Sequence, residues 1–207
     1  MRSACALPGV RPAQRYWVMP RRTFSHVVGF DDAPFDRARR GNVPIVGAVF
    51  SGLRLEGVLR GEVRRDGANA TRTIIRLVTG SKFSPQLQLI LLQGIAVAGF
   101  NVIDLARLER DTGLPVLVIA RRQPNTEDIR NALLESVPGG KRKWALIERL
   151  GPMEKVAGVF VQRRGLSLAD AGRVIETLAV HGHIPEPLRT AHLMAGGIVR
   201  GQSRGRT

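Results

Sequence analysis

Two nearly continuous apolar runs constrain the fold of this chain more than any other feature. Residues 87–93 are LQLILLQ and residues 115–120 are PVLVIA. A strand with apolar residues at successive positions must be covered on both faces, because alternate side chains point to opposite sides of a sheet. Between the runs, VIDLARLERDTG predicts a helix that ends at Gly113. We therefore expect a layered α/β domain in which these runs are central strands.

The segment before the first run predicts three strands and a helix. HVVGF, residues 26–30, fits a buried strand, and residues 43–52 and 55–65 fit the next two, joined as an antiparallel meander. NATRTIIRLV, residues 69–78, places apolar side chains at helical spacing, with Asn69 as the expected N-cap. Three strands and one helix thus come before the central runs.

The second half continues the alternation of helices and strands. Residues 125–137 predict a helix capped by Asn125, VAGVFVQ predicts a last short strand, and residues 167–182 predict a helix that starts with a Ser-x-x-Asp capping box. Pro185 and Pro187 are expected to open the final helix. The order β-β-β-α-β-α-β is the ribonuclease H-like pattern. It predicts a mixed sheet of three antiparallel strands, then alternating helices and strands, flanked by helices.

The ends of the chain differ in composition from its middle. Residues 1–24 are basic and lack an apolar run long enough for a secretion signal, and Met19 is an alternative start. Residues 199–207 are rich in glycine and arginine. We expect two mobile extensions around one domain, residues 25–198. The single cysteine, Cys5, excludes an internal disulfide and fits a reducing compartment, which favours a cytoplasmic protein.

The charge of the chain favours a polyanionic partner. Its 32 Lys and Arg residues against 17 Asp and Glu give a formal net charge of +15. Each phosphate neutralised by such a protein releases condensed counterions, which predicts RNA or DNA as the partner. A host that uses arginine for solubility is the alternative explanation. The uncharged stretch 83–103 contains glycine, proline and glutamine, and it fits a strand, a turn and a helix start better than a membrane span.

Several motifs resemble a known family in their order and spacing. They are VVGFDDAPF, DGANATRTI, the long segment from SKFSPQ to IARRQP, and HIPEPLRTAHLMAGGI. Over about residues 25–205 they resemble the uncharacterised endonuclease V-like family called domain of unknown function ninety-nine. PEPLRTAH also resembles the C-terminal segment of endonuclease V itself. The resemblance implies a ribonuclease H-like fold, whereas nuclease activity depends on the site residues.

The resemblance allows a test of the metal-binding carboxylates. Two-metal hydrolysis needs several carboxylates, and endonuclease V supplies them at the ends of strands one and four and on helix one. Asp31 matches the first position, but Arg72 stands at the second and Gln93 at the third. A guanidinium repels a cation, and an amide offers only a neutral oxygen. We therefore expect a mostly replaced site in which Asp31 is the residual catalytic carboxylate and the possible Mg²⁺ ligand.

Other acidic residues are weaker candidates for this site. Asp32 should point away from Asp31, because neighbouring side chains of a strand alternate. Asp66 lies in an RDG sequence that favours a turn, and Asp104 either favours a helix N-terminus or approaches the sheet. RRGLSL resembles the GHRxSL segment of endonuclease V with Arg164 in place of its histidine. At the positions of Arg72, Gln93 and Arg164, side chains that are positive or neutral thus stand where the endonuclease V pattern has catalytic carboxylates or a histidine.

Three histidines lie in the segment HGHIPEPLRTAH. Their spacing does not place two of them on one helical face, so a metal site is not favoured. We expect His181 and His183 to lie in a loop and His192 to pack against the core or cap a helix.

Arginines at strand ends predict a nucleic-acid-binding surface, since strand ends gather at ligand-binding edges of such sheets. Ordinary solvated charge is the alternative for each residue alone. The glycine turn after residue 93 could receive a base or a phosphate on its backbone N–H groups, or be a plain tight turn. The predicted nucleic-acid-binding residues are Arg72, Gln93, Arg121, Arg122, Arg163, Arg164 and Arg189, and the predicted pocket residues are Gly94, Gly99 and Asn101.

Three functions remain open from the sequence. The first is a nucleic-acid-binding protein without cleavage activity and without a cofactor, with a ribonucleoprotein assembly as one setting. The second is a divalent-metal-dependent endonuclease that uses Asp31, with Mg²⁺ as cofactor and a modified base as the recognised feature. The third is a small-nucleotide-binding protein that uses residues 94–101, which leaves the charge unexplained.

Overall fold

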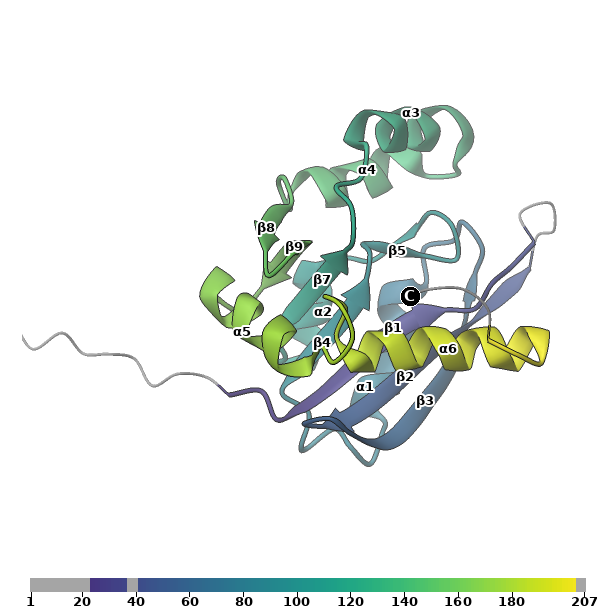
Figure 1. Ribbon diagram of the computed structural model, residues 1–207. Helices are drawn as coiled ribbons and strands as arrows, with labels where there is room; N and C mark the ends of the chain where they lie inside the picture. Colours follow the sequence, from purple (N-terminus) through teal and green to yellow (C-terminus); the bar gives the residue numbers. More distant parts are fainter. Residues whose placement is uncertain (1–22, 37–40, 204–207) are drawn as a thin grey trace, which may run out of the picture.

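The computed structural model describes residues 23–36 and 41–203, which fold around one mixed sheet (Figure 1). The strands are β1 (His26–Asp32), β2 (Asn42–Ser51), β3 (Arg54–Arg64), β4 (Leu89–Gln93), β5 (Ala96–Val97), β6 (Asn101–Val102), β7 (Val116–Ala120), β8 (Glu154–Val156) and β9 (Val159–Arg164). The helices are α1 (Ala70–Thr79), α2 (Leu105–Thr112), α3 (Thr126–Ser136), α4 (Gly140–Glu148), α5 (Leu168–Leu178) and α6 (Glu186–Arg200).

The sheet has seven strands in the order β3-β2-β1-β4-β7-β9-β8, and β5 pairs with β6 separately. β1 pairs antiparallel with β2 and parallel with β4, and β4 pairs parallel with β7. The expected mixed sheet is therefore confirmed. Because β1, β4 and β7 run in one direction, their carboxyl ends lie at the same edge of the sheet.

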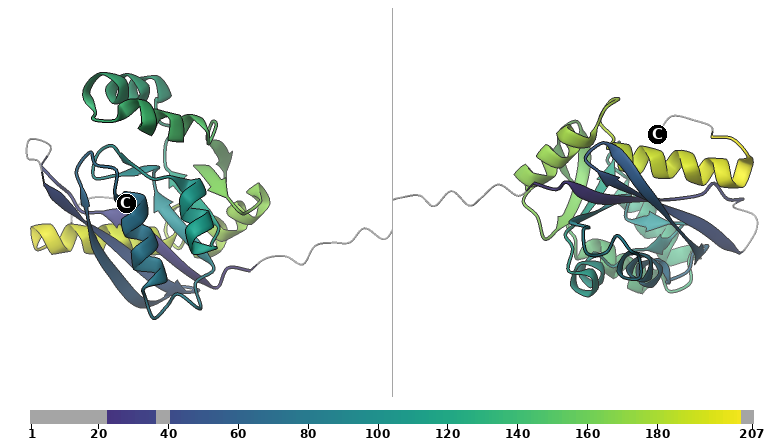
Figure 2. Two further views of the ribbon diagram at one scale, coloured as in Figure 1. Left: turned by 180° about the vertical axis from the view of Figure 1, so that it is seen from behind. Right: turned by 90° about the horizontal axis from the view of Figure 1, so that it is seen from below.

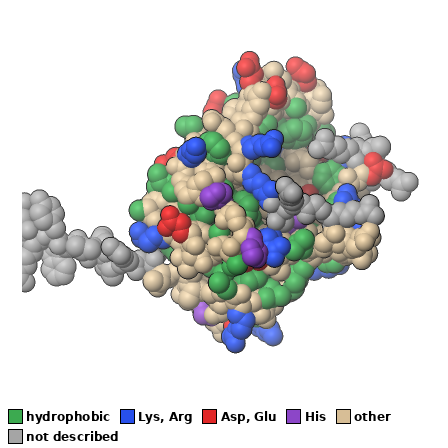
Figure 3. Space-filling model, viewed as in Figure 1, with side chains coloured by type: hydrophobic (Ala, Val, Ile, Leu, Met, Phe, Trp, Pro, Cys, Tyr) green, Lys and Arg blue, Asp and Glu red, His purple; other side chains and the backbone are tan. Residues whose placement is uncertain are grey.

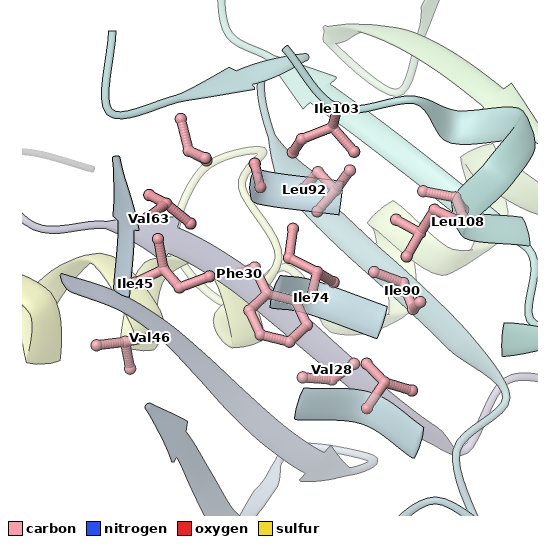
Figure 4. Packing of buried hydrophobic residues seen from close by; sticks show 14 of the residues in the cluster. Val28, Phe30, Ile45, Val46, Val63, Ile74, Ile90, Leu92, Ile103 and Leu108 are labelled. Atoms are coloured by element: carbon pink, nitrogen blue, oxygen red, sulfur yellow. The ribbon is translucent and has the colours of Figure 1, made fainter. Parts of the chain in front are cut away.

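Helices cover both faces of this sheet. Figure 2 shows α6 on one side and α1 and α2 on the other, while α3 and α4 stand beyond the end of β7. Phe30 of β1 packs with Ile74 of α1 and Leu108 of α2 on one face (Figure 4). On the other face Leu91 packs with Leu188 of α6. The two apolar runs are thus buried on both sides, as expected.

The N-terminal part of α6 lies directly on the backbone of β1. A Cβ atom added at Gly29 would lie 2.6 Å from the carbonyl carbon of Pro187, closer than any side chain could come. Glycine at this position therefore sets the distance between strand and helix. Among the described residues, no helix is long and apolar enough to cross a membrane.

The start of α1 is capped differently from the expectation. Asn69 makes no side-chain capping bond to the helix; its Oδ1 accepts from the backbone N–H of Arg64 instead. The N–H of Ala70 donates to Oδ1 of Asn101, which is fully buried. The residue that caps α1 is therefore Asn101 of β6, 31 positions away in sequence. A capping residue at this distance cannot be recognised from the residues next to the helix start. Asn125 and Ser167 do cap α3 and α5 as expected.

Three boundaries also differ from the expectation. The last strand is a hairpin of β8 and β9, joined through Ala157 and Gly158, both with positive φ. α4 was not predicted, because it begins at the second glycine of a pair, Gly140, and three cationic residues that oppose the helix dipole come next. α6 continues to Arg200, past the predicted domain end at residue 198.

The contact at Gly29 leads to a stability prediction. Gly29→Ala should lower the free energy of unfolding by about 2–3 kcal/mol, because the added methyl group forces α6 away from β1. Urea unfolding of the two proteins measures this difference. Gly197→Ala on α6 is the matched control, since the nearest atom to its Cβ is 3.7 Å away. If the Gly29→Ala variant and the control had equal free energies of unfolding, the close contact between β1 and α6 would be contradicted.

Candidate active site

A buried carboxylate and an imidazole meet at the carboxyl end of β1. Asp31 is only 6% exposed, and its Oδ2 lies 2.7 Å from Nδ1 of His192 on α6. Oδ1 of Asp31 accepts from the backbone N–H of Asp32 at 2.9 Å. The hydrogen bond that His192 donates to the carboxylate of Asp31 is the main cause that raises the pKa of His192. From the sequence we expected His192 to pack against the core or to cap a helix, so its pairing with Asp31 was not predicted.

The fold places these two residues together by simple periodicity. Asp31 follows Gly29 by two positions, so both face α6. His192 follows Leu188 by four positions, so it lies on the buried face of α6, above the same strand. A histidine at that spacing from a buried leucine is the sequence feature that could have indicated the pair. It was missed because nothing local in the sequence says which strand α6 covers.

Asp32 points to the opposite side of β1, as expected from strand alternation. Its Oδ2 accepts from the backbone N–H of Ala98 at 3.0 Å. Burial raises the pKa of Asp32 to about 6, and the neighbouring charge of Asp31 acts in the same direction. The two carboxylates therefore influence one another although they face different sides of the strand.

Gln93 ends β4 beside the Asp31–His192 pair. Phe30 of β1 is paired in parallel register with Leu92, so Asp31 and Gln93 occupy the next position on neighbouring strands. The Oε1 atom of Gln93 is buried and has no hydrogen-bond partner among the described residues. Buried acceptors in proteins normally have a hydrogen-bond partner. A ligand bound next to Asp31 would supply one for Oε1 of Gln93.

The loop from Gly94 to Asn101 serves mainly to hold the fold together. Asn101 uses its Oδ1 for Ala70 and its Nδ2 for the carbonyl of Arg64 and for Asn69, so its side chain is engaged inside the protein. A Cβ at Gly99 would meet Oδ1 of Asp66. Of the three predicted pocket residues, Gly94 borders a pocket of about 440 Å³ and Gly99 borders a different one of about 530 Å³, whereas Asn101 lines neither.

Asp66 fixes this loop and connects it to α4. Its side chain accepts from the N–H of Phe100, and its carbonyl accepts from Nζ of Lys143 at 2.6 Å. Lys143 is 3% exposed, and burial lowers its pKa. Asp66 thus forms a turn, as expected. Asp104 caps α2 by accepting from the backbone N–H of Arg107, which confirms the helix interpretation.

A pocket of about 440 Å³ opens where β4 and β7 end. α3 and α4 cover it, and most of its wall is apolar. Gly94, the residue after Gln93, borders it, but neither Asp31 nor His192 does. Ile95 and Met153 of its lining pack against the core on the α1 and α2 side of the sheet, whereas His192 lies on α6. The lining residues are Gly94, Ile95, Ala120, Pro124, Thr126, Ile129, Trp144, Ile147, Glu148, Gly151, Pro152, Met153 and Gln162.

The predicted basic residues divide into two groups. Arg163 binds Glu154 and the carbonyl of Leu166, Arg164 binds Glu109, and Arg189 binds Glu186. Their guanidinium groups are therefore engaged in holding the fold.

The remaining predicted arginines, Arg72, Arg121 and Arg122, are exposed. They form no ion pair with another residue of the described ranges. Arg72 lies on α1, which covers the face opposite α6. Arg121 is close enough to His192 to lower the pKa of that imidazole.

The pKa of Asp32 leads to a prediction about stability. Because its folded pKa of about 6 exceeds the ordinary 3.8, the folded state binds more protons between these values, and stability falls as pH rises through this window. Asp32→Asn removes this cost and should stabilise the protein at pH 7.5 by on the order of 2 kcal/mol, with little effect at pH 3.5. Thermal unfolding at both pH values measures the difference. A variant that is no more stable than the wild type at pH 7.5 would contradict the burial of this charge.

Comparison with known proteins agrees with this fold. A crystal structure of a protein of unknown function from Archaeoglobus fulgidus has a TM-score of 0.79 and 33% identity, and covers 85% of this chain and 99% of its own. Endonuclease V of Ciona intestinalis, solved with an inosine-containing 24-mer DNA, has a TM-score of 0.56 at 13% identity, covering 86% and 87%. That likeness establishes the endonuclease V fold.

Sequence comparison establishes the family. A UPF0215 protein from Deinococcus radiodurans is 60% identical over 181 residues, which is 87% of this chain and 92% of the relative. A UPF0215 protein from Methanosarcina barkeri is 40% identical over 185 residues, covering 87% and 93%. The sequence profile of the family described as endonuclease dU matches residues 23–199. The chain therefore belongs to the endonuclease dU family.

Proposed function

We propose that this protein is an endonuclease that cuts a nucleic acid strand near an altered base, with Asp31 and His192 at its reaction centre. The observation that carries the proposal is their 2.7 Å hydrogen bond at the carboxyl end of β1. The name of its family, endonuclease dU, and an endonuclease V structure with inosine-containing DNA support a base-directed strand cleavage. The net charge of +15 supports binding of the strand.

The residues around Asp31 fit a divalent cation that is held in part by the substrate. Mg²⁺ takes oxygen ligands, keeps several waters and is often bound by one or two carboxylates together with phosphates. Asp31 and the unpartnered Oε1 of Gln93 would be its protein ligands. When bound, the cation would act as a Lewis acid on the phosphodiester. The described residues contain no group of three or more His, Cys, Asp or Glu able to hold a metal alone.

His192 has the position of an acid–base group. Its Nδ1–H donates to Asp31, which fixes the ring and leaves Nε2 to accept or deliver a proton. The side chain is 29% exposed, so a substrate can reach it. Asp31 therefore orients the imidazole and stabilises its charged form, which raises the pKa of His192.

The volume and the lining of the 440 Å³ pocket support a role in holding the recognised base. An enzyme that reads one altered base takes it out of the stack and encloses it between apolar or aromatic side chains. Trp144 supplies an aromatic wall, and its Nε1–H donates to Glu148 at 3.3 Å, which fixes the indole. Gly94 brings backbone to the same pocket with φ of +83°, a conformation that favours glycine.

A second candidate is a protein that binds a strand without cutting it. Two observations favour it: Arg72 and Gln93 replace carboxylates of the endonuclease V pattern, and the described residues contain no three-ligand metal group. Such a protein would act by holding RNA or DNA, as in a ribonucleoprotein assembly. The cleavage assay below separates the two functions.

Cleavage should depend on the Asp31–His192 pair. We expect the wild type with Mg²⁺ or Mn²⁺ to cut labelled strands that contain deoxyuridine or inosine faster than unmodified strands. Asp31→Asn and His192→Ala should each lower the single-turnover rate by about 100-fold or more, because each removes a group at the reaction centre. Strand binding should stay within a few-fold of the wild type.

The matched control is Asp111→Asn, which removes an exposed carboxylate of α2 that pairs with Arg107. This variant should cut at the wild-type rate. Tight strand binding by the wild type, together with no cleavage in either metal on any strand, would reject the endonuclease and establish the second candidate.

The base pocket yields a separate prediction. Trp144→Ala should reduce the preference for the altered base by about 10-fold, because one stacking surface worth about 1–3 kcal/mol is lost. The ratio of cleavage rates on altered and unmodified strands measures this preference. An unchanged ratio would place base recognition elsewhere in the protein.

A further inference from the structure

We propose that a second pocket, formed around Arg121, His181 and His183, binds a backbone phosphate of the strand beside the reaction centre. We call it the Arg–His pocket. The inference rests on the proposed function for its substrate class, a nucleic acid strand. It adds a binding site on two histidines for which the sequence predicted only a loop position.

Three segments that are distant in sequence form this pocket. Arg121 follows the end of β7, Gly158 and Val159 come from the β8–β9 hairpin, and the histidines lie in the loop between α5 and α6. The volume is about 290 Å³. Every ionisable residue in its lining is basic, and the lining residues are Arg121, Gly158, Val159, His181, Gly182, His183 and Ile184. Figure 3 shows imidazoles beside Lys or Arg side chains on this face of the protein.

The position of His183 is fixed by a close contact. A Cβ added at Gly158 would lie 2.6 Å from Nδ1 of His183, so the imidazole ring rests on the glycine backbone. The φ of Gly158 is +80°, which also favours glycine. On either side of the pocket Val159 and Ile184 are buried, at 1% and 6% exposure. The hairpin and the loop therefore hold the ring in a defined place.

The chemistry of the lining fits a phosphate better than a cation. A guanidinium and two imidazoles offer N–H donors, and a phosphate oxygen accepts such donors. No carboxylate lines the pocket, and it contains only two of the His, Cys, Asp or Glu side chains that could hold a metal ion. Arg121 forms no ion pair with another described residue, so its charge is available to a ligand.

The pocket also lies beside the reaction centre. Arg121 follows the end of β7, which runs parallel to β4 and β1, so it lies at the same edge of the sheet as Asp31. The loop that carries His181 and His183 leads directly into α6, which carries His192. A strand with one phosphodiester at Asp31 and His192 would therefore extend a neighbouring phosphate toward Arg121.

Binding of an unmodified strand without metal tests this pocket. The probe is a fluorescein-labelled single-stranded 20-mer, and anisotropy in EDTA is measured over a range of salt concentrations with the full chain. Arg121→Gln should weaken binding by about 10-fold and reduce the slope of log K against log salt by about 0.7, the value for one lost phosphate contact on a single strand. His183→Ala should weaken binding in the same direction.

Arg76→Gln is the matched control, because it removes the same charge from an exposed position on α1, on the opposite face. Arg76→Gln should weaken binding of the labelled strand by about 2-fold or less. Equal effects of Arg121→Gln and Arg76→Gln, or no strand binding by the wild type, would overturn the pocket whatever the cleavage assay shows. Selective loss with Arg121→Gln and His183→Ala would establish the pocket, even if no metal supported cleavage and the proposed endonuclease failed. Thermal unfolding of each variant confirms that it is folded.

Discussion

The contact between α6 and the backbone of β1 at Gly29 controls the geometry of the candidate active site. Only a glycine leaves room for Pro187 at this distance. The approach brings the buried face of α6 onto β1, where His192 reaches the carboxylate of Asp31. A strand near the N-terminus and a helix near the C-terminus thus form one site, 161 positions apart in sequence. The site exists only when the whole sheet has folded.

The same end of β1 carries a cost in stability. Asp32 is partly buried beside the buried carboxylate of Asp31, and its pKa, raised to about 6, means that its charged form is disfavoured in the folded state. The turn that supplies its hydrogen bond contains Ala98 with φ of +48° and is held by Asp66, whose φ is +49°. Strained backbone and a buried charge at one sheet edge are features that proteins retain at functional sites.

Much of the fold could be predicted because its patterns are local. The two apolar runs, the helix ends at Asn125 and Gly113, and the antiparallel meander of the first three strands all follow from spacing along the chain. The cap of α1 by Asn101 and the pairing of Asp31 with His192 could not, because each joins residues that only tertiary packing brings together. α4 escaped prediction because its N-terminal charges oppose the helix dipole and its stability comes from packing, including buried Lys143.

The candidate site was therefore predicted in part. Asp31 and Gln93 were placed correctly at neighbouring strand ends, since parallel strands end at one edge. The arginines were harder to assign, because an ion pair such as Arg164 with Glu109 depends on the distance between distant elements. Where the sequence predicted a mostly replaced metal site, the structure shows a carboxylate–imidazole pair at the end of β1, and two pockets border the residues that follow β4 and β7.

The most direct test of this account is a crystal structure of the Asp31→Asn variant with a strand that contains deoxyuridine. The account predicts a phosphodiester within hydrogen-bond distance of His192, with the altered base inside the pocket lined by Gly94 and Trp144. A strand bound on the α1 face, or one whose phosphates all lie away from His192, would contradict it.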